Sequence, residues 1–91
     1  MPRYVVERTF PDAFALPLTD DGDRACRTVD GHNAEAGVHW LHSYFSADRT
    51  RSFCVYDGPD AEAIRRAAHA NDLPVDGITE VRVLDPHFYR P

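Results

Sequence analysis

The sequence contains no lysine, and its ten arginine residues are outnumbered by fifteen acidic residues, which gives a net charge of −5. This excess of negative charge would repel the phosphate backbone of nucleic acids and the anionic surface of a membrane. Cysteine is also scarce, because Cys26 and Cys54 are too few for the disulfide framework of a small secreted domain. We therefore expect free thiols and predict that neither nucleic acid nor a membrane is a partner.

Long apolar runs are missing as well. No segment is apolar over the length that crosses a membrane, and residues 1–6 lack the apolar core of a secretion signal. These absences predict a cytoplasmic protein. The 91 residues, with no internal repeat or linker, predict a single domain over residues 1–91. A chain of this size buries only roughly 60–65% of its unfolded surface, so we expect further burial in a homodimer.

The residues that are present alternate between strand and helix signals. Segments 3–9, 38–46, 51–57 and 76–85 are rich in the β-branched and aromatic residues of strands, whereas prolines within residues 10–18 predict a loop. We expect one helix from an N-cap at Thr19 or Asp20 to a stop at Gly37, and another over residues 61–70. The order β-α-β-β-α-β predicts an α+β ferredoxin-like fold, in which a four-stranded antiparallel sheet carries both helices on one face.

Alternation along the strands predicts which side chains occupy the sheet face that the helices leave open. Tyr4 and Val6 are expected to point at the helices, which leaves Glu7 on the open face. The helix side is also expected to receive Leu41, Phe45, Phe53, Val55, Val81 and Val83. The open face is then predicted to carry Glu7, Trp40, His42, Tyr44, Cys54, Tyr56, Glu80 and Arg82.

This predicted open face is rich in aromatic side chains at its centre. Exposed faces seldom carry several large aromatics together. A second copy of the sheet is therefore expected to cover it, as in a dimeric α/β barrel, and to enclose a polar, aromatic-lined pocket.

His42 and Cys54 offer an imidazole and a thiolate, and Glu7 is the carboxylate that strand alternation places beside them. Mixed nitrogen, sulfur and oxygen donors suit zinc, nickel, copper or iron(II). The spacing matches no local metal-binding signature, so packing is the alternative: His42 hydrogen-bonded to Glu7, with Cys54 as a small hydrophobic residue.

The same residues also allow enzymatic interpretations. Cys54 can be a nucleophile activated by His42, and an acid–base site can be built from His42, Glu7 and Tyr44 around a small organic ligand. The alternative to metal binding is therefore a small dimeric α/β-barrel enzyme of the monooxygenase or cyclase type, acting on a small aromatic ligand. A third hypothesis is a ligand-carrying or purely interacting module, whose ligand binding would survive a chelator.

Four segments carry a resemblance to a known family: "RYVVERTF", "HSYFSAD", "FCVYDGPDAEAIRRAAHANDLP" and "ITEVRVLDPHFY". They resemble a family of small bacterial proteins, known as a domain of unknown function, that includes a homodimeric nickel-binding protein of ferredoxin-like fold. The resemblance implies a dimer with its sheets face to face and a transition metal as cofactor, nickel in the described case. It implies His42 and Cys54 as ligands, with Glu7 added by strand alternation. The leading hypothesis is thus a homodimer that binds nickel, or zinc or another divalent transition metal.

Overall fold

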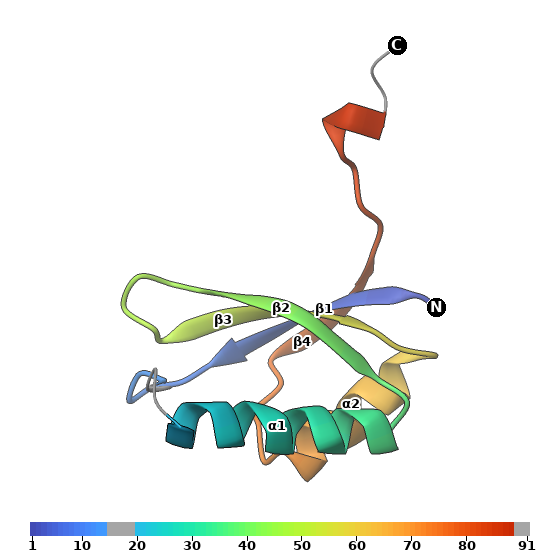
Figure 1. Cartoon of the computed structure of the whole chain (residues 1–91). Helices are drawn as coiled ribbons and strands as arrows, with labels where there is room; N and C mark the ends of the chain where they lie inside the picture. The colour runs from blue at the N-terminus through green and yellow to red at the C-terminus, as the bar shows by residue number, and fades with distance from the viewer. Residues whose placement is uncertain (15–19, 89–91) are drawn as a thin grey trace.

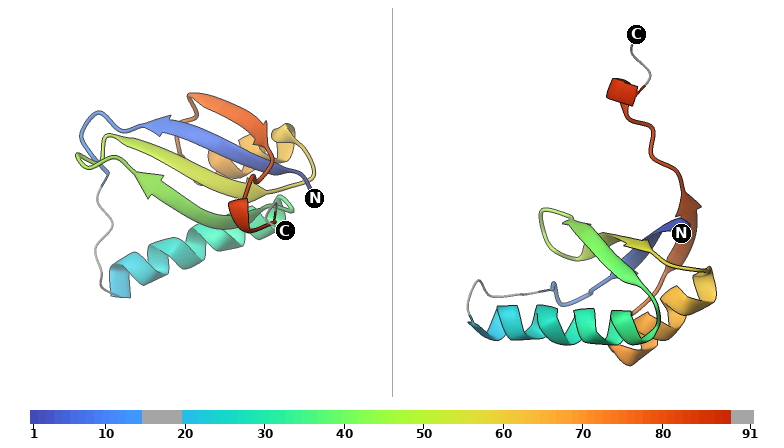
Figure 2. Two further views of the ribbon diagram at one scale, coloured as in Figure 1. Left: turned by 90° about the horizontal axis from the view of Figure 1, so that it is seen from above. Right: turned by 45° about the vertical axis from the view of Figure 1, so that its right-hand side comes forward.

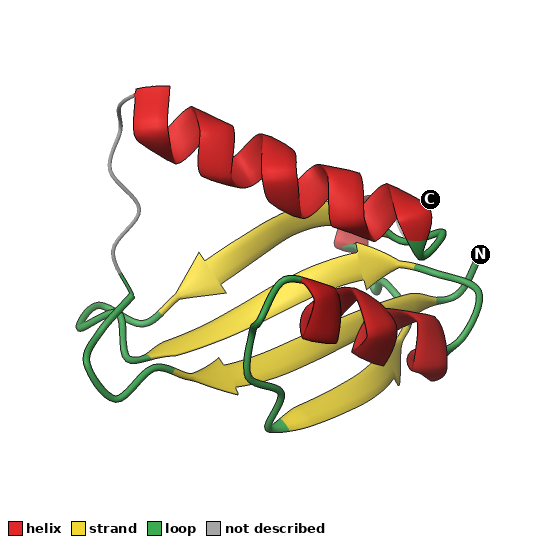
Figure 3. Cartoon of the chain, turned by 90° about the horizontal axis from the view of Figure 1, so that it is seen from below, coloured by secondary structure: helices red, strands yellow, loops and turns green. Residues whose placement is uncertain are grey.

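The computed structural model describes residues 1–14 and 20–88. Its elements are β1 (Arg3–Thr9), α1 (Asp20–Glu35), β2 (His39–Phe45), β3 (Arg51–Asp57), α2 (Ala61–Ala70), β4 (Gly77–Val81) and a short 3-10 helix at Pro86–Phe88. The strands form one antiparallel sheet in the order β2-β3-β1-β4, and both helices lie on one face of it (Figure 1 and Figure 3). The predicted ferredoxin-like α+β fold is confirmed for the single chain.

The helix ends follow the local chemistry that the sequence predicts. The side chain of Asp60 accepts a hydrogen bond from the backbone N–H of Ala63 at 2.8 Å and so caps the first turn of α2. After α1, Gly37 adopts a φ of 73°, a left-handed conformation that glycine tolerates best. The predicted cap at Thr19 and the second half of the predicted 10–18 loop lie outside the described residues.

The core lies between the helices and the sheet face that they cover. Small side chains on α2 let this helix approach the sheet closely, and Ile64, 1% exposed, fills the space between them. The buried cluster comprises Tyr4, Val6, Val38, Cys54, Tyr56, Ala63, Ile64 and Ala67. Two of these residues, Cys54 and Tyr56, were predicted on the opposite face.

The orientation of β3 is the main correction to the predicted sheet. β1 pairs with β3 so that Tyr4 opposes Tyr56 and Val6 opposes Cys54. Directly opposed residues of an antiparallel pair point to the same face. Tyr56 and Cys54 therefore face the helices, and the prediction that they lie on the open face is wrong. Phe53 takes the open face instead.

A bulge in β2 changes the alternation within that strand. Trp40 opposes Tyr56, but the next paired residue is His42, opposite Val55, so that Leu41 is the extra residue. As a consequence Trp40 points to the helix side whereas His42 and Tyr44 point to the open face. The predicted placement is therefore correct for His42 and Tyr44 and wrong for Trp40.

The last strand is shorter than predicted, and its side chains point to the faces opposite to those predicted. Ile78 opposes Val6 on the helix side, whereas Val81 opposes Arg3 on the open face. Glu80 opposes Tyr4, so it lies on the helix side at the exposed edge of the sheet and not on the open face. β4 ends at Val81, opposite Arg3, and the residue before Arg3 is Pro2, which has no N–H to donate to a longer ladder.

Arg82, Val83 and the 3-10 helix follow β4 as an extended tail. The tail leaves the domain on the side of the sheet away from the helices (Figure 1 and Figure 2). Its hydrophobic residues Val83 and Leu84 are 57% and 78% exposed. Arg82 therefore lies beyond the sheet, and its predicted position on the open face is also wrong.

Candidate functional site

No helix lies over the open face of the sheet (Figure 1). The side chains that point to this face are Val5, Glu7, His42, Tyr44, Phe53 and Val55. Its centre is arranged in two rows across the strands. One row runs from His42 through Val55 to Val5, and the neighbouring row runs from Tyr44 through Phe53 to Glu7. His42 and Glu7 thus share a face but lie on strands that β3 separates.

His42 is exposed on this face and packs edge-on against the ring of Tyr44. The two ring centroids are 5.1 Å apart with an interplanar angle of 83°. Such an edge-to-face contact orients the imidazole without using its ring nitrogens. Tyr44 is itself 62% exposed, so both rings are available to a ligand or a partner.

A second histidine, His39, also lies on the open face, although strict alternation from Leu41 would direct it to the other face. His39 opposes Asp57, which in turn opposes Arg3, and the bulge at Leu41 brings His39 and His42 to one side of β2. Beside it, the Arg3 guanidinium donates to Asp57 at 2.9 Å and lowers the pKa of that carboxyl. Only knowledge of the bulge could have placed His39 here.

Cys54 is separated from His42 by the sheet itself. It is 7% exposed on the helix side, and its thiol donates a hydrogen bond to the Ser52 hydroxyl at 3.7 Å. The predicted constellation of His42 and Cys54 on one face is therefore wrong. Within residues 1–14 and 20–88, no three His, Cys, Asp or Glu side chains come together in a group that could hold a metal ion.

Two of the residues predicted for the open-face pocket lie together at the far edge of the sheet. Glu80 and Arg82 line a surface pocket of about 560 Å³ with Arg3, Asp57 and the N-terminus. Arg3 and Asp57, which form an ion pair, line this pocket, and both are partly exposed. Exposed pairs of this kind contribute little stability.

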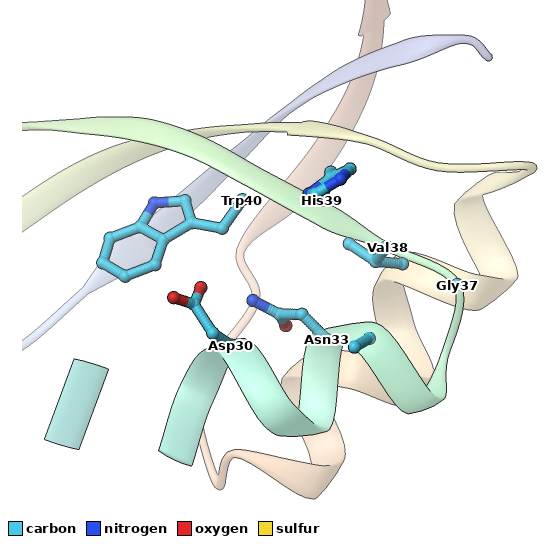
Figure 4. Close-up of a pocket in the computed structure, with 7 residues that line it drawn as sticks. Asp30, Asn33, Gly37, Val38, His39 and Trp40 are labelled. Atoms are coloured by element: carbon cyan, nitrogen blue, oxygen red, sulfur yellow. The ribbon is translucent and has the colours of Figure 1, made fainter. Parts of the chain in front are cut away.

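A pocket of about 650 Å³ lies where α1 meets the start of β2 (Figure 4). Asp30 and Asn33 rise from α1 toward Trp40 (Figure 4). Asn33 is 2% exposed, and its side-chain oxygen accepts a hydrogen bond from the Asn71 amide at 3.2 Å. The Asn71 oxygen meets the His32 ring nitrogen at 2.7 Å, so this network joins the ends of α1 and α2. Its role is to hold the two helices together.

A partly open, mainly apolar pocket of about 270 Å³, which we call the Arg8 cavity, lies between α1 and the covered face of the sheet. Three aromatic residues, Phe10, Phe14 and Phe45, form one wall, with Phe14 stacked on Phe45 at 5.3 Å. The remaining lining is Arg8, Ala25, Cys26, Val29, Trp40, Ser43, Ser52, Cys54, Tyr56, Asn71 and Leu73. Arg8 was not singled out in the sequence, although alternation from Tyr4 and Val6 already directs it toward the helices.

Comparisons with known proteins place this geometry in a family. Among curated proteins, none matches the chain. Among solved structures, the crystal structure of SCO4226 from Streptomyces coelicolor A3(2) matches with a TM-score of 0.70 and 18% sequence identity. That match covers 91% of this chain and 99% of SCO4226, and at this identity it supports the fold alone.

Two further findings concern membrane-spanning helices and family membership. None of the helices in the described segments is long and apolar enough to cross a membrane. Residues 4–81 match the family described as nickel responsive protein SCO4226-like. The chain therefore belongs to the SCO4226-like family of nickel responsive proteins.

Proposed function

We propose that this protein binds nickel at the open face of its sheet, as a homodimer whose two sheets face each other. The observation that carries the proposal is an exposed imidazole, that of His42, on a sheet face that no helix covers, in a member of a nickel responsive family. Nickel(II) binds imidazole nitrogen and carboxylate oxygen, and the geometry of the donors rather than affinity sets its selectivity. Zinc or another divalent transition metal would compete for the same donors.

The donors that we propose are those on the open face. His42 supplies the first imidazole and His39, on the same side of β2, is available as a second. Glu7 is the carboxylate of this face. Because the described part of one chain holds no three-donor group, we infer that donors from a second copy or water complete the coordination shell.

Cys54 is left out of this ligand set. Its thiol lies on the other side of the sheet, under the helices, and bonds to Ser52. The nickel site that we propose is therefore built from nitrogen and oxygen donors, in contrast to the mixed nitrogen and sulfur set that the sequence predicts.

A second copy of the sheet suits the chemistry of the open face. Tyr44 is 62% exposed there, and Phe53 and Val5 are only half-buried. Two sheets packed face to face lie about 10 Å apart, which would bury these side chains and exclude water from the imidazole. The tail places exposed Val83 and Leu84 on the same side, where a second copy would contact them.

The test is nickel binding by protein purified without an affinity tag, measured by calorimetry and elemental analysis. We expect His42→Ala to weaken nickel binding by more than ~10-fold, because changing even the residues that only support metal ligands costs about 10–100-fold in affinity. His69→Ala is the matched control, since His69 is an exposed histidine on α2, away from the open face. Cys54→Ala separates the two ligand sets: we expect unchanged nickel binding, whereas a nitrogen and sulfur site would lose it.

The oligomeric state is measured on the same samples by light scattering. A dimer in the parent protein that weakens in Tyr44→Ala would support the face-to-face arrangement. Nickel binding that is equal in the parent, His42→Ala and His69→Ala proteins would contradict the proposed site.

A further inference from the structure

Arg8 is a buried cation on the side of the sheet that the proposed nickel site does not use. The residue is 2% exposed, and its Nε and Nη1 atoms are buried without a hydrogen-bond partner in the described part of the chain. Its guanidinium carbon lies 5.7 Å from the centroid of the Tyr56 ring. This cation–π contact compensates part of the lost hydration, but it provides no acceptor for the N–H groups.

No counter-charge lines the Arg8 cavity in the part of the chain that the structure describes. Among the residues that line the Arg8 cavity, Arg8 is the only one with a charged side chain at neutral pH. Burial raises the pKa of the Tyr56 hydroxyl, so this neighbour remains a neutral phenol. A buried charge without a partner is strongly unfavourable, and a bound anion would remove much of this cost.

The size of the cavity limits what such an anion can be. Its volume is about 270 Å³, whereas an apolar cavity of about 150 Å³ accommodates benzene. One aromatic ring with a short acidic side chain therefore fits. Inorganic anions fit the charge but would leave the walls formed by Phe10, Phe14, Val29 and Leu73 without apolar contacts.

We propose that the Arg8 cavity binds a small organic carboxylate with an apolar, ring-sized body. The carboxylate accepts hydrogen bonds from the Arg8 guanidinium, and the body packs against the aromatic wall and α1. Guanidinium groups recognise carboxylates through charge-assisted hydrogen bonds. The site is separate from the proposed nickel site because the sheet lies between them.

Trp40 makes the proposal directly testable. It is the only tryptophan in the chain and it lines the Arg8 cavity, so its fluorescence reports on occupancy. The probes are phenylacetate and phenylacetamide, which share one shape and differ in charge, titrated in the presence of EDTA. We expect saturable quenching by phenylacetate, and binding of the amide weaker by about tenfold or more, as expected for loss of a charged hydrogen bond.

Variants assign the binding to Arg8. Arg8→Met keeps an unbranched apolar stem and removes the charge, and we expect it to bind phenylacetate no better than phenylacetamide. Arg51→Met is the matched control, because Arg51 is exposed at the start of β3 and does not line the cavity. It should bind phenylacetate as the parent does.

A further measurement needs no variant and locates the ligand. Cys26 and Cys54 both line the cavity, from α1 and β3 respectively. Saturating phenylacetate should slow their alkylation by iodoacetamide severalfold, whereas phenylacetamide at the same concentration should not.

The proposal is overturned if phenylacetate and phenylacetamide bind the parent equally, or if Arg8→Met binds phenylacetate as tightly as the parent. Absence of saturable phenylacetate binding at millimolar concentration would equally overturn it, and would leave ordered water as the partner of Arg8. Since EDTA is present throughout, none of these outcomes depends on nickel.

Discussion

Two neighbouring residues of β1 show how different the two faces of the sheet are. On the helix-covered face, Arg8 is buried among mainly apolar side chains, and two of its nitrogen atoms have no partner among residues 1–14 and 20–88. On the open face, Glu7 is exposed beside hydrophobic residues such as Phe53. The covered face thus buries a charge, whereas the open face displays apolar surface, and our two proposals assign an anion to the first and a second copy to the other. Each face of the single chain lacks a different kind of partner.

This contrast shows that hydrophobicity alone does not decide which side chains lie on which face of the sheet. The covered face includes Ser52 and Cys54, both buried, while Tyr44 on the open face is 62% exposed. An isolated chain with this distribution has apolar surface left over on one side and unmet hydrogen-bonding capacity on the other. Both are accounted for if a second copy and a small carboxylate complete the molecule.

The largest expected effect comes from a matched pair of substitutions on opposite faces of β1. Val6→Ala should lower the free energy of unfolding by about 2–3 kcal/mol, because Val6 is 0% exposed and its truncation leaves a cavity. Val5→Ala, on the open face, should cost well under half as much in a monomer. Urea denaturation monitored by circular dichroism measures both.

Protein concentration sharpens this comparison. If the open face is a dimer interface, the cost of Val5→Ala depends on protein concentration, whereas the cost of Val6→Ala does not. Equal costs for the two substitutions at every concentration would contradict the contrast between the faces.

A smaller effect, of opposite sign, is expected at Arg8. Without a ligand, Arg8→Met should raise the free energy of unfolding by about 1–2 kcal/mol, because it removes an uncompensated buried charge and leaves an unbranched apolar side chain. Arg51→Met should leave stability nearly unchanged, since Arg51 is exposed. Marked destabilisation of Arg8→Met would show that Arg8 contributes to packing more than its unpaired nitrogens cost.

The smallest effect is expected in the β2–β3 hairpin, which belongs to neither face. Hydrogen bonds from the backbone and side chain of Thr50, and from the Ser46 hydroxyl, lower the pKa of Asp48 to about 2. The unfolded value is about 3.9. Because the folded pKa is the lower one, the stabilisation is complete above the unfolded value and is lost as the pH falls toward about 2.

A titration of the Asp48 carboxyl carbon by NMR measures this pKa. Ser46→Ala should move the midpoint upward, toward the ordinary value of an aspartate. A parent midpoint already near that ordinary value would contradict the hydrogen-bonding arrangement of the hairpin.

The order of the elements and part of the candidate site could be predicted from the sequence. Gly37 marks a helix end by local backbone chemistry, which needs no tertiary information. Glu7 and His42 were placed on the open face, as the structure has them. These positions follow from strand alternation, with Tyr4 and Val6 as unambiguous markers of the covered face.

The faces of β3 could not be predicted in the same way. Phe53 and Val55 form one apolar set, and Cys54 and Tyr56 form another, so hydrophobicity gives no clear choice between the two faces. A strand has only two such choices, and an error reverses every side chain at once. The bulge at Leu41 adds a second reversal inside β2, and no turn or glycine signal in that strand announces it.

The sequence by itself determined the fold class, the ends of most elements and the absence of charge suited to nucleic acid, because these depend on local propensity and composition. The tertiary structure alone decided that His42 and Cys54 lie on opposite sides of the sheet and that Arg8 is buried where no described residue lining its cavity carries a counter-charge. Both facts depend on which residues oppose each other across strands distant in sequence. That pairing is set by the packing of the whole domain, since the helices bury one face of all four strands together.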